Sequence, residues 1–207
     1  WDEQTVLEDL DLMVEAGVTM VSPAIFAWAK LEPHPGVFDL DWLEDLLDRL
    51  HARGIAVDLA TGTASPPVWM GKTWPETLPI DSLGRTLKHG SRQAYNPSSK
   101  VFQERMALLV TEMAARFAHH PAVVSWHVSN ELGCHVNESF DPESTEAFQD
   151  WLRRKYGTLE ELNRAWGTAF WSQHYSQWSE INSPGATPTF QNPHAAADWK
   201  QFNSDAL

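Results

Sequence analysis

Amphipathic helical segments alternate with short apolar runs along this chain, and this alternation constrains the fold more than any other feature. In each helical segment the apolar residues recur every three or four positions, and the run that follows is short enough for one buried strand. The three pairs are 5–16 with 18–21, 42–53 with 55–60, and 101–117 with 122–128. Helices that alternate with apolar strands are typical of parallel βαβ units. We therefore predict an α/β fold with a parallel sheet.

Local signals mark where several elements begin and end. Thr5 and Glu8 have the spacing of a capping box, and Gly17 follows as a stop signal. Asp141-Pro142 predicts the start of a helix that runs to about Tyr156, and Thr158 predicts the start of the next helix. The tail beyond Ser172 has no clear periodicity. The connections 22–40 and 61–97 are long, which in a compact domain is typical of functional loops.

The number of strands indicates an incomplete barrel. A closed (β/α)₈ TIM barrel has eight strands and about 250 residues, whereas this chain has 207 residues and three clear strands. We predict that residues 1–207 form one incomplete TIM-barrel domain. The chain begins with Trp1 and not with an initiator Met, so we expect it to be part of a longer protein.

Composition excludes several classes of partner. The net charge of −13 argues against nucleic acid and against anionic membranes as partners. No apolar run is long enough to span a membrane, and no glycine-rich phosphate loop is present. The only cysteine, Cys134, cannot form an intrachain disulfide, which is compatible with the cytoplasm. Eleven tryptophans stand out; most should fill the core, but indole also suits the apolar faces of sugar rings.

One segment combines a strand end with a carboxylate. The apolar run 122–128 leads into Asn130-Glu131, and barrel enzymes keep their catalytic groups at the C-terminal ends of strands. Glu131 could therefore serve as the acid and base of a glycosidase, or it could simply cap the next element. Arg92 lies in the long loop after the second strand, where its donors could fix sugar hydroxyls or form a surface ion pair.

Two other chemistries use the same region. His127, Glu131 and His135 are spaced i, i+4, i+8 and would share one face of a helix as metal ligands, but the preceding apolar strand and Gly133 disfavour a helix there. Cys134 could be a nucleophile, although the sequence indicates no third group to orient it.

Seven ordered blocks of the sequence resemble the bacterial β-galactosidases of glycoside hydrolase family 42. The blocks are 12–17, 26–33, 35–39, 63–69, 90–92, 126–131 and 166–173. The resemblance implies a retaining enzyme on a (β/α)₈ barrel, with the three strands as barrel strands two to four. It implies that Glu131 is the acid/base, that Asn130, Arg92 and Trp171 bind the sugar, and that Trp171 forms an aromatic wall. It also implies a galactoside substrate and a homotrimer.

The chain departs from the family pattern in two respects. The family's nucleophilic glutamate would fall beyond Leu207, so we expect the isolated chain to be inactive. Many members hold zinc with four cysteines, but Asn96 stands at one of these positions and only Cys134 remains, so we expect no metal and no cofactor. The alternatives are a sister specificity, β-glucosidase or α-L-arabinopyranosidase, or a non-catalytic carbohydrate-binding remnant.

Overall fold

The computed structural model describes residues 2–206 and divides into two compact units. The strand unit comprises Trp1–Met70 and Arg105–Glu131, and the helical unit comprises Gly71–Glu104 and Leu132–Leu207. Helices α4 (Val68–Thr73) and α5 (Lys100–Phe117) each continue from one unit into the other.

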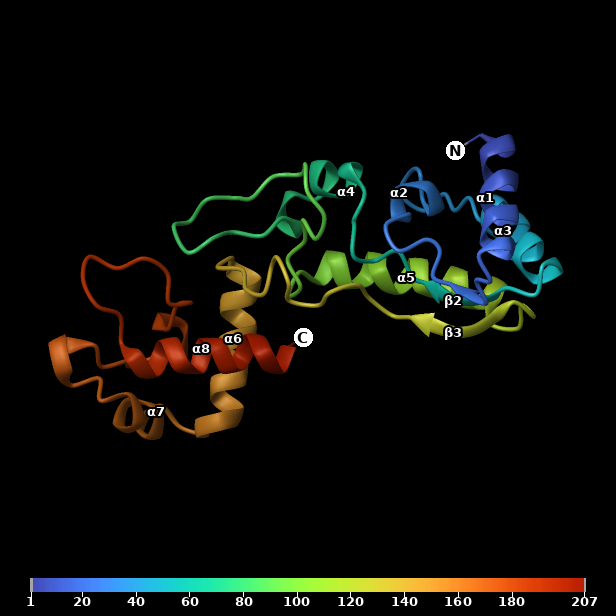
Figure 1. The fold of residues 1–207 in the computed structure, drawn as a ribbon. Helices are drawn as coiled ribbons and strands as arrows, with labels where there is room; N and C mark the ends of the chain where they lie inside the picture. The colour runs from blue at the N-terminus through green and yellow to red at the C-terminus, as the bar shows by residue number, and fades with distance from the viewer. Residues whose placement is uncertain (1, 207) are drawn as a thin grey trace. The chain divides into compact units, whose positions relative to one another are not determined.

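Three parallel strands form the sheet of the strand unit, in the order β1-β2-β3 (Figure 1). The elements of this unit are α1 (Glu3–Glu15), β1 (Met20–Val21), α2 (Trp28–Leu31), α3 (Asp41–Ala52), β2 (Ala56–Ala60) and β3 (Val123–His127). Helix α3 connects β1 to β2, and α5 connects β2 to β3, so each pair of neighbouring strands is a βαβ unit. The predicted parallel α/β arrangement is confirmed.

The two faces of the sheet differ in polarity. Val57 and Leu59 of β2 share one face and are completely buried, as are leucines of α3 and apolar side chains of α5. On the other face the Asp58 carboxylate accepts hydrogen bonds from the hydroxyls of Ser22 (3.0 Å), which directly follows β1, and of Ser125 (2.7 Å) in β3. The alternation of side chains along a strand explains this separation. The polar face is the one that would line the interior of a closed barrel.

Helices dominate the second unit. Its elements are the short 3₁₀ helix η1 (Pro75–Thr77), then α6 (Pro142–Tyr156), α7 (Leu159–Trp166), the 3₁₀ helices η2 (Phe170–Ser172) and η3 (Trp178–Glu180), and α8 (Pro193–Ala206). Its core consists of Phe148, Leu152, Leu162, Trp166, Ile181, Trp199 and Phe202. The buried Asp198 carboxylate links three of the helices, because it accepts from Lys155, from the Tyr156 hydroxyl and from the Trp166 indole.

Most predicted elements are confirmed, and the differences have local causes. Helix α1 begins before the predicted capping box, because the Asp2 carboxylate accepts from the Thr5 amide (2.9 Å) and caps the helix. Beyond Ser172, where the sequence shows no clear periodicity, no α-helix was predicted, but the structure contains one. Helix α8 forms there, with Pro193 in its first turn and the Asn192 side chain accepting from the His194 amide. The starts of α6 and α7 are confirmed, with side-chain caps from Asp141 and Thr158.

Candidate active site

The carboxyl end of β3 carries the two predicted catalytic-site residues of the strand unit. β3 ends at His127, and Asn130 and Glu131 follow after three and four residues. Glu131 is exposed and has a left-handed backbone conformation, with φ of 51°. Such a conformation is uncommon for residues other than glycine, and it persists only where the surrounding structure holds it in place.

The loop after β2 holds the end of β3 in place. The Thr61 amide donates to the His127 carbonyl (3.2 Å), and the Thr61 hydroxyl donates to the Val128 carbonyl (2.7 Å). Thr61 and Thr63 are buried, and their hydroxyls are 2.8 Å apart. The sequence interpretation missed both threonines. The signal that could have found them is a pair of polar residues directly after a strand, which is where barrel enzymes build their sites.

A second network surrounds the buried Glu32 in the strand unit. The Glu32 carboxylate accepts from the Trp28 indole (2.8 Å), from the Gly36 amide (2.7 Å) and from the Arg105 guanidinium. The Trp69 indole donates to the Glu32 backbone carbonyl at 3.0 Å. Burial lowers the pKa of Arg105, and the negative charge of Glu32 offsets the cost of burying that cation.

Arg92 belongs to the helical unit and is exposed. Its Nε atom lies 3.1 Å from Nε2 of His135, and the His135 amide donates to the Oε1 atom of Gln93 at 3.1 Å. Gln93 is buried and has a left-handed backbone, with φ of 59°. Within the helical unit the Arg92 guanidinium therefore donates to a histidine.

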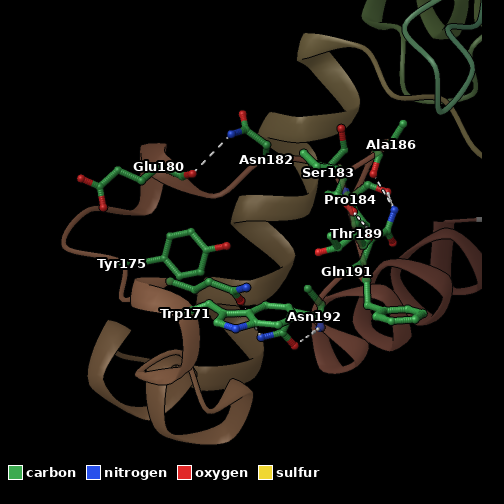
Figure 2. Close-up of a pocket in the computed structure, with 16 residues that line it drawn as sticks. Trp171, Tyr175, Glu180, Asn182, Ser183, Pro184, Ala186, Thr189, Gln191 and Asn192 are labelled. Carbon is green, nitrogen blue, oxygen red and sulfur yellow. Dashed lines mark hydrogen bonds between the residues drawn. The ribbon is translucent and has the colours of Figure 1, made fainter.

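Trp171 also belongs to the helical unit, and it differs from the other tryptophans. It is 59% exposed, and of the tryptophans in residues 2–206 it alone is exposed. Its backbone and that of Ser172 are both left-handed, with φ of 56° and 55°. Trp171 lines a pocket of about 520 Å³ together with Tyr175 and Asn192 (Figure 2). The expectation that most tryptophans fill the core was wrong for residues 2–206, where only three tryptophans are buried and most are partly buried.

The four predicted site residues are therefore divided between the units. Asn130 and Glu131 lie at the end of the strand unit, whereas Arg92, on a loop, and Trp171, in η2, belong to the helical unit. Arg92 is not among the residues that line the pocket of Trp171.

The helical metal site is wrong, because the segment 127–135 is not a helix. His127 belongs to β3, where its Nδ1 atom lies 3.8 Å from the Asp58 carboxylate, and Gly133 has φ of 70°. The spacing i, i+4, i+8 therefore does not place the three side chains on one helical face. Cys134 is an exposed free thiol.

A family model described as β-galactosidase, of glycoside hydrolase family 42, matches residues 1–207. The chain belongs to glycoside hydrolase family 42. It is 50% identical over 207 residues to a β-galactosidase of an Arthrobacter species, and 47% identical to β-galactosidase LacZ of Heyndrickxia coagulans. These matches cover the whole of this chain but only 30% and 31% of those relatives, so the chain spans about a third of their length.

Solved structures of β-galactosidases have the same fold over this segment. The β-galactosidase from the psychrophilic Marinomonas ef1 matches with a TM-score of 0.95 and 40% identity, over 100% of this chain and 32% of that one. The family resemblance and the partial (β/α)₈ barrel are both confirmed. None of the helices within residues 2–206 is long and apolar enough to cross a membrane.

Proposed function

We propose that this chain is part of a retaining glycoside hydrolase that removes terminal β-D-galactosyl residues from β-galactosides. The relatives named above are β-galactosidases, which supports this activity and substrate class for the protein that contains residues 1–207. In this proposal residues 1–207 are an incomplete barrel domain. The nucleophilic glutamate lies outside them, so the isolated chain should not turn over substrate.

The observation that carries the proposal is the backbone at the predicted site residues. Within residues 2–206, the residues other than glycine with positive φ are Ala24, Gln93, Glu131, Trp171 and Ser172. Four of these five are a predicted site residue or the immediate neighbour of one. Each such conformation costs on the order of 1–3 kcal/mol, and such strain is concentrated where function requires a fixed geometry.

Each residue then has a chemical role. Glu131 protonates the oxygen of the leaving group, and in the second step it removes a proton from the attacking water. Asn130 donates to the hydroxyl next to the reacting carbon, a contact that strengthens in the transition state. Arg92 fixes further hydroxyls with its fork of donors, and the exposed indole of Trp171 packs against the apolar face of the sugar. Retention requires the second carboxyl group at about 5–5.5 Å from Glu131.

The remaining assignments follow the family. We propose a bacterial, cytoplasmic protein, supported by the bacterial relatives and by the single cysteine, which cannot form an intrachain disulfide. A homotrimer is proposed from the family resemblance alone. No metal or cofactor takes part in the proposed reaction.

Hydrolysis of an aryl β-D-galactoside by the full-length protein tests the proposal. Glu131→Gln should lower kcat/KM by about 10²–10⁴-fold, because it removes the general acid. Added azide should restore turnover of an activated substrate by Glu131→Ala and yield galactosyl azide, since azide attacks without a general base. Glu112→Gln, an exposed position on α5, is the matched control and should retain activity.

Other outcomes would contradict the proposal. Wild-type activity that is greater on an aryl β-glucoside or α-L-arabinopyranoside would assign a sister specificity. Sugar binding without hydrolysis of any of these substrates would make the protein a carbohydrate-binding remnant.

A further inference from the structure

The segment Thr61-Gly62-Thr63 connects β2 to the predicted acid/base through buried hydroxyl groups. Both threonines are buried, and both hydroxyls approach one backbone acceptor, the Val128 carbonyl, at 2.7 Å from Thr61 and 3.4 Å from Thr63. All of these atoms belong to the strand unit, where β2 and β3 lie side by side (Figure 1).

Because each hydroxyl has a single proton, the donor and the acceptor in each of these contacts can be assigned. A threonine hydroxyl has one proton to donate. Thr61 donates its proton to the Val128 carbonyl, its shortest contact, so the 2.8 Å contact with Thr63 must use a proton from Thr63. Thr63 therefore supports Thr61, and a hydroxyl that accepts one hydrogen bond donates a stronger one.

These bonds also determine where β3 ends. Successive carbonyls of a strand point to opposite edges. Here two successive carbonyls, those of His127 and Val128, both accept from Thr61, one from its amide and one from its hydroxyl. The chain therefore leaves the strand geometry at Val128, and Glu131 reaches its left-handed conformation three residues later.

The threonine loop is itself tightly held. Gly62 has φ of 75°, and a Cβ atom on it would lie 3.1 Å from Leu31 Cδ1 and 3.3 Å from the Ala24 carbonyl oxygen. The backbone next to Thr61 therefore has little freedom to move, so the position of the Thr61 hydroxyl relative to β3 is fixed.

We propose that Thr61, supported by Thr63, is a positioning residue for the general acid/base Glu131. Its hydroxyl fixes the position of the Val128 carbonyl. The direction of the backbone after β3, and so the placement of Asn130 and Glu131, depends on that carbonyl. This inference rests on the proposed function, since it assigns Thr61 a role in the acid catalysis of Glu131.

Positioning of an acid has a kinetic signature that general stability lacks. The kcat/KM of a retaining glycosidase reports the step in which the leaving group departs. A poor leaving group such as phenol needs protonation in that step, whereas dinitrophenol does not. A displaced acid therefore slows phenyl galactoside hydrolysis selectively.

The experiment compares the two substrates on variants of the full-length protein. Thr61→Val removes the hydroxyl and keeps the shape, and Thr61→Ser restores the hydroxyl. Thr111→Val is the matched control, because the Thr111 hydroxyl also donates to a backbone carbonyl at 2.7 Å but lies on the exposed side of α5. Glu131→Gln is measured in parallel.

We expect Thr61→Val to lose about 10- to 100-fold in kcat/KM on phenyl galactoside, the scale of a small misplacement of a catalytic group. It should lose little on dinitrophenyl galactoside, and Thr61→Ser and Thr111→Val should stay near wild type. If Thr61→Val does not fold, Thr63→Val replaces it and should show a smaller loss with the same selectivity.

Two results would overturn the proposal, and a third would overturn the function beneath it. An equal loss on both substrates would make Thr61 merely structural, and no loss would remove its role altogether. If Glu131→Gln itself lacked the selectivity for poor leaving groups, the acid/base assignment would be wrong, and the proposed mechanism with it.

Discussion

Replacing Glu32 by glutamine should destabilise the protein more than any comparable change on its surface. The Glu32 side chain is 0% exposed, and its two oxygens accept from three donors. Oε2 accepts from the Trp28 indole, and Oε1 accepts from the Gly36 amide and from Arg105. A glutamine has one acceptor oxygen, so in either orientation its amide group faces at least one of these donors.

The size of the effect follows from the loss of charge. The Arg105 side chain is 14% exposed, so the substitution leaves a cation with little access to water beside a neutral group. Breaking a buried ion pair from one side costs about 3–5 kcal/mol. We expect about 3 kcal/mol for Glu32→Gln, because the glutamine still fills the space and keeps part of the hydrogen bonding.

Thermal unfolding of the full-length protein measures the loss of stability caused by Glu32→Gln. For domains of 150–250 residues, 1 kcal/mol corresponds to about 2–4 °C in Tm, and the shift is smaller for larger domains, so the expected decrease is at most about 6–12 °C. Glu44→Gln is the control, because Glu44 pairs with Arg116 at the surface and such pairs contribute at most about 1 kcal/mol.

The double variant Glu32→Gln with Arg105→Met distinguishes the contribution of the ion pair from that of the other hydrogen bonds of Glu32. Because Arg105→Met also removes the cation that Glu32 pairs with, the double variant should lose less stability than the two single variants together. A Glu32→Gln protein that melts within the range of Glu44→Gln would refute the reasoning, as would strict additivity in the double variant.

Two further predictions concern other parts of the chain. Gly62→Ala should lower the free energy of unfolding by about 2 kcal/mol, because φ of 75° strains alanine and the new Cβ would crowd Leu31. Gly54→Ala is the control: φ is 71° there but nothing lies within 4 Å of the new Cβ, so the loss should be about 1 kcal/mol. Equal decreases in Tm for the two variants would contradict this prediction. Burial, together with the hydrogen bond to Asp198, raises the pKa of Tyr156 from 10 to about 12. Between these values the folded protein keeps a proton that the unfolded chain releases, so the free energy of unfolding is undiminished below pH 10 and falls as the pH rises toward 12. Tyr156→Phe should flatten this fall in urea unfolding measured across that range, and an unchanged slope would show that another group is responsible.

Local sequence patterns were sufficient for most helices and strands. Apolar residues at helical spacing predicted α3 and α5, and the short apolar runs predicted β2 and β3. These patterns succeed for α3, α5 and β2 because each of these elements must bury apolar side chains, so the requirement is visible in consecutive residues. Strand β3 was predicted correctly although it lies at the edge of the sheet and is only partly buried. The patterns failed for α8, whose Asn192-Pro193 start is a local signal that was overlooked.

The sequence by itself determined the family, the parallel α/β class and the four candidate site residues. Ordered motifs and strand ends carry that information in consecutive positions. Only the tertiary structure decided which residues far apart in the sequence are in contact. Glu32 meets Arg105 across 73 positions of the chain, and Thr61 meets Val128 across 67. Left-handed backbone at Glu131 and Trp171 is not the conformation that their side chains prefer. Such contacts and conformations depend on which segments pack together, and periodicity along the chain records only which face of each segment is buried.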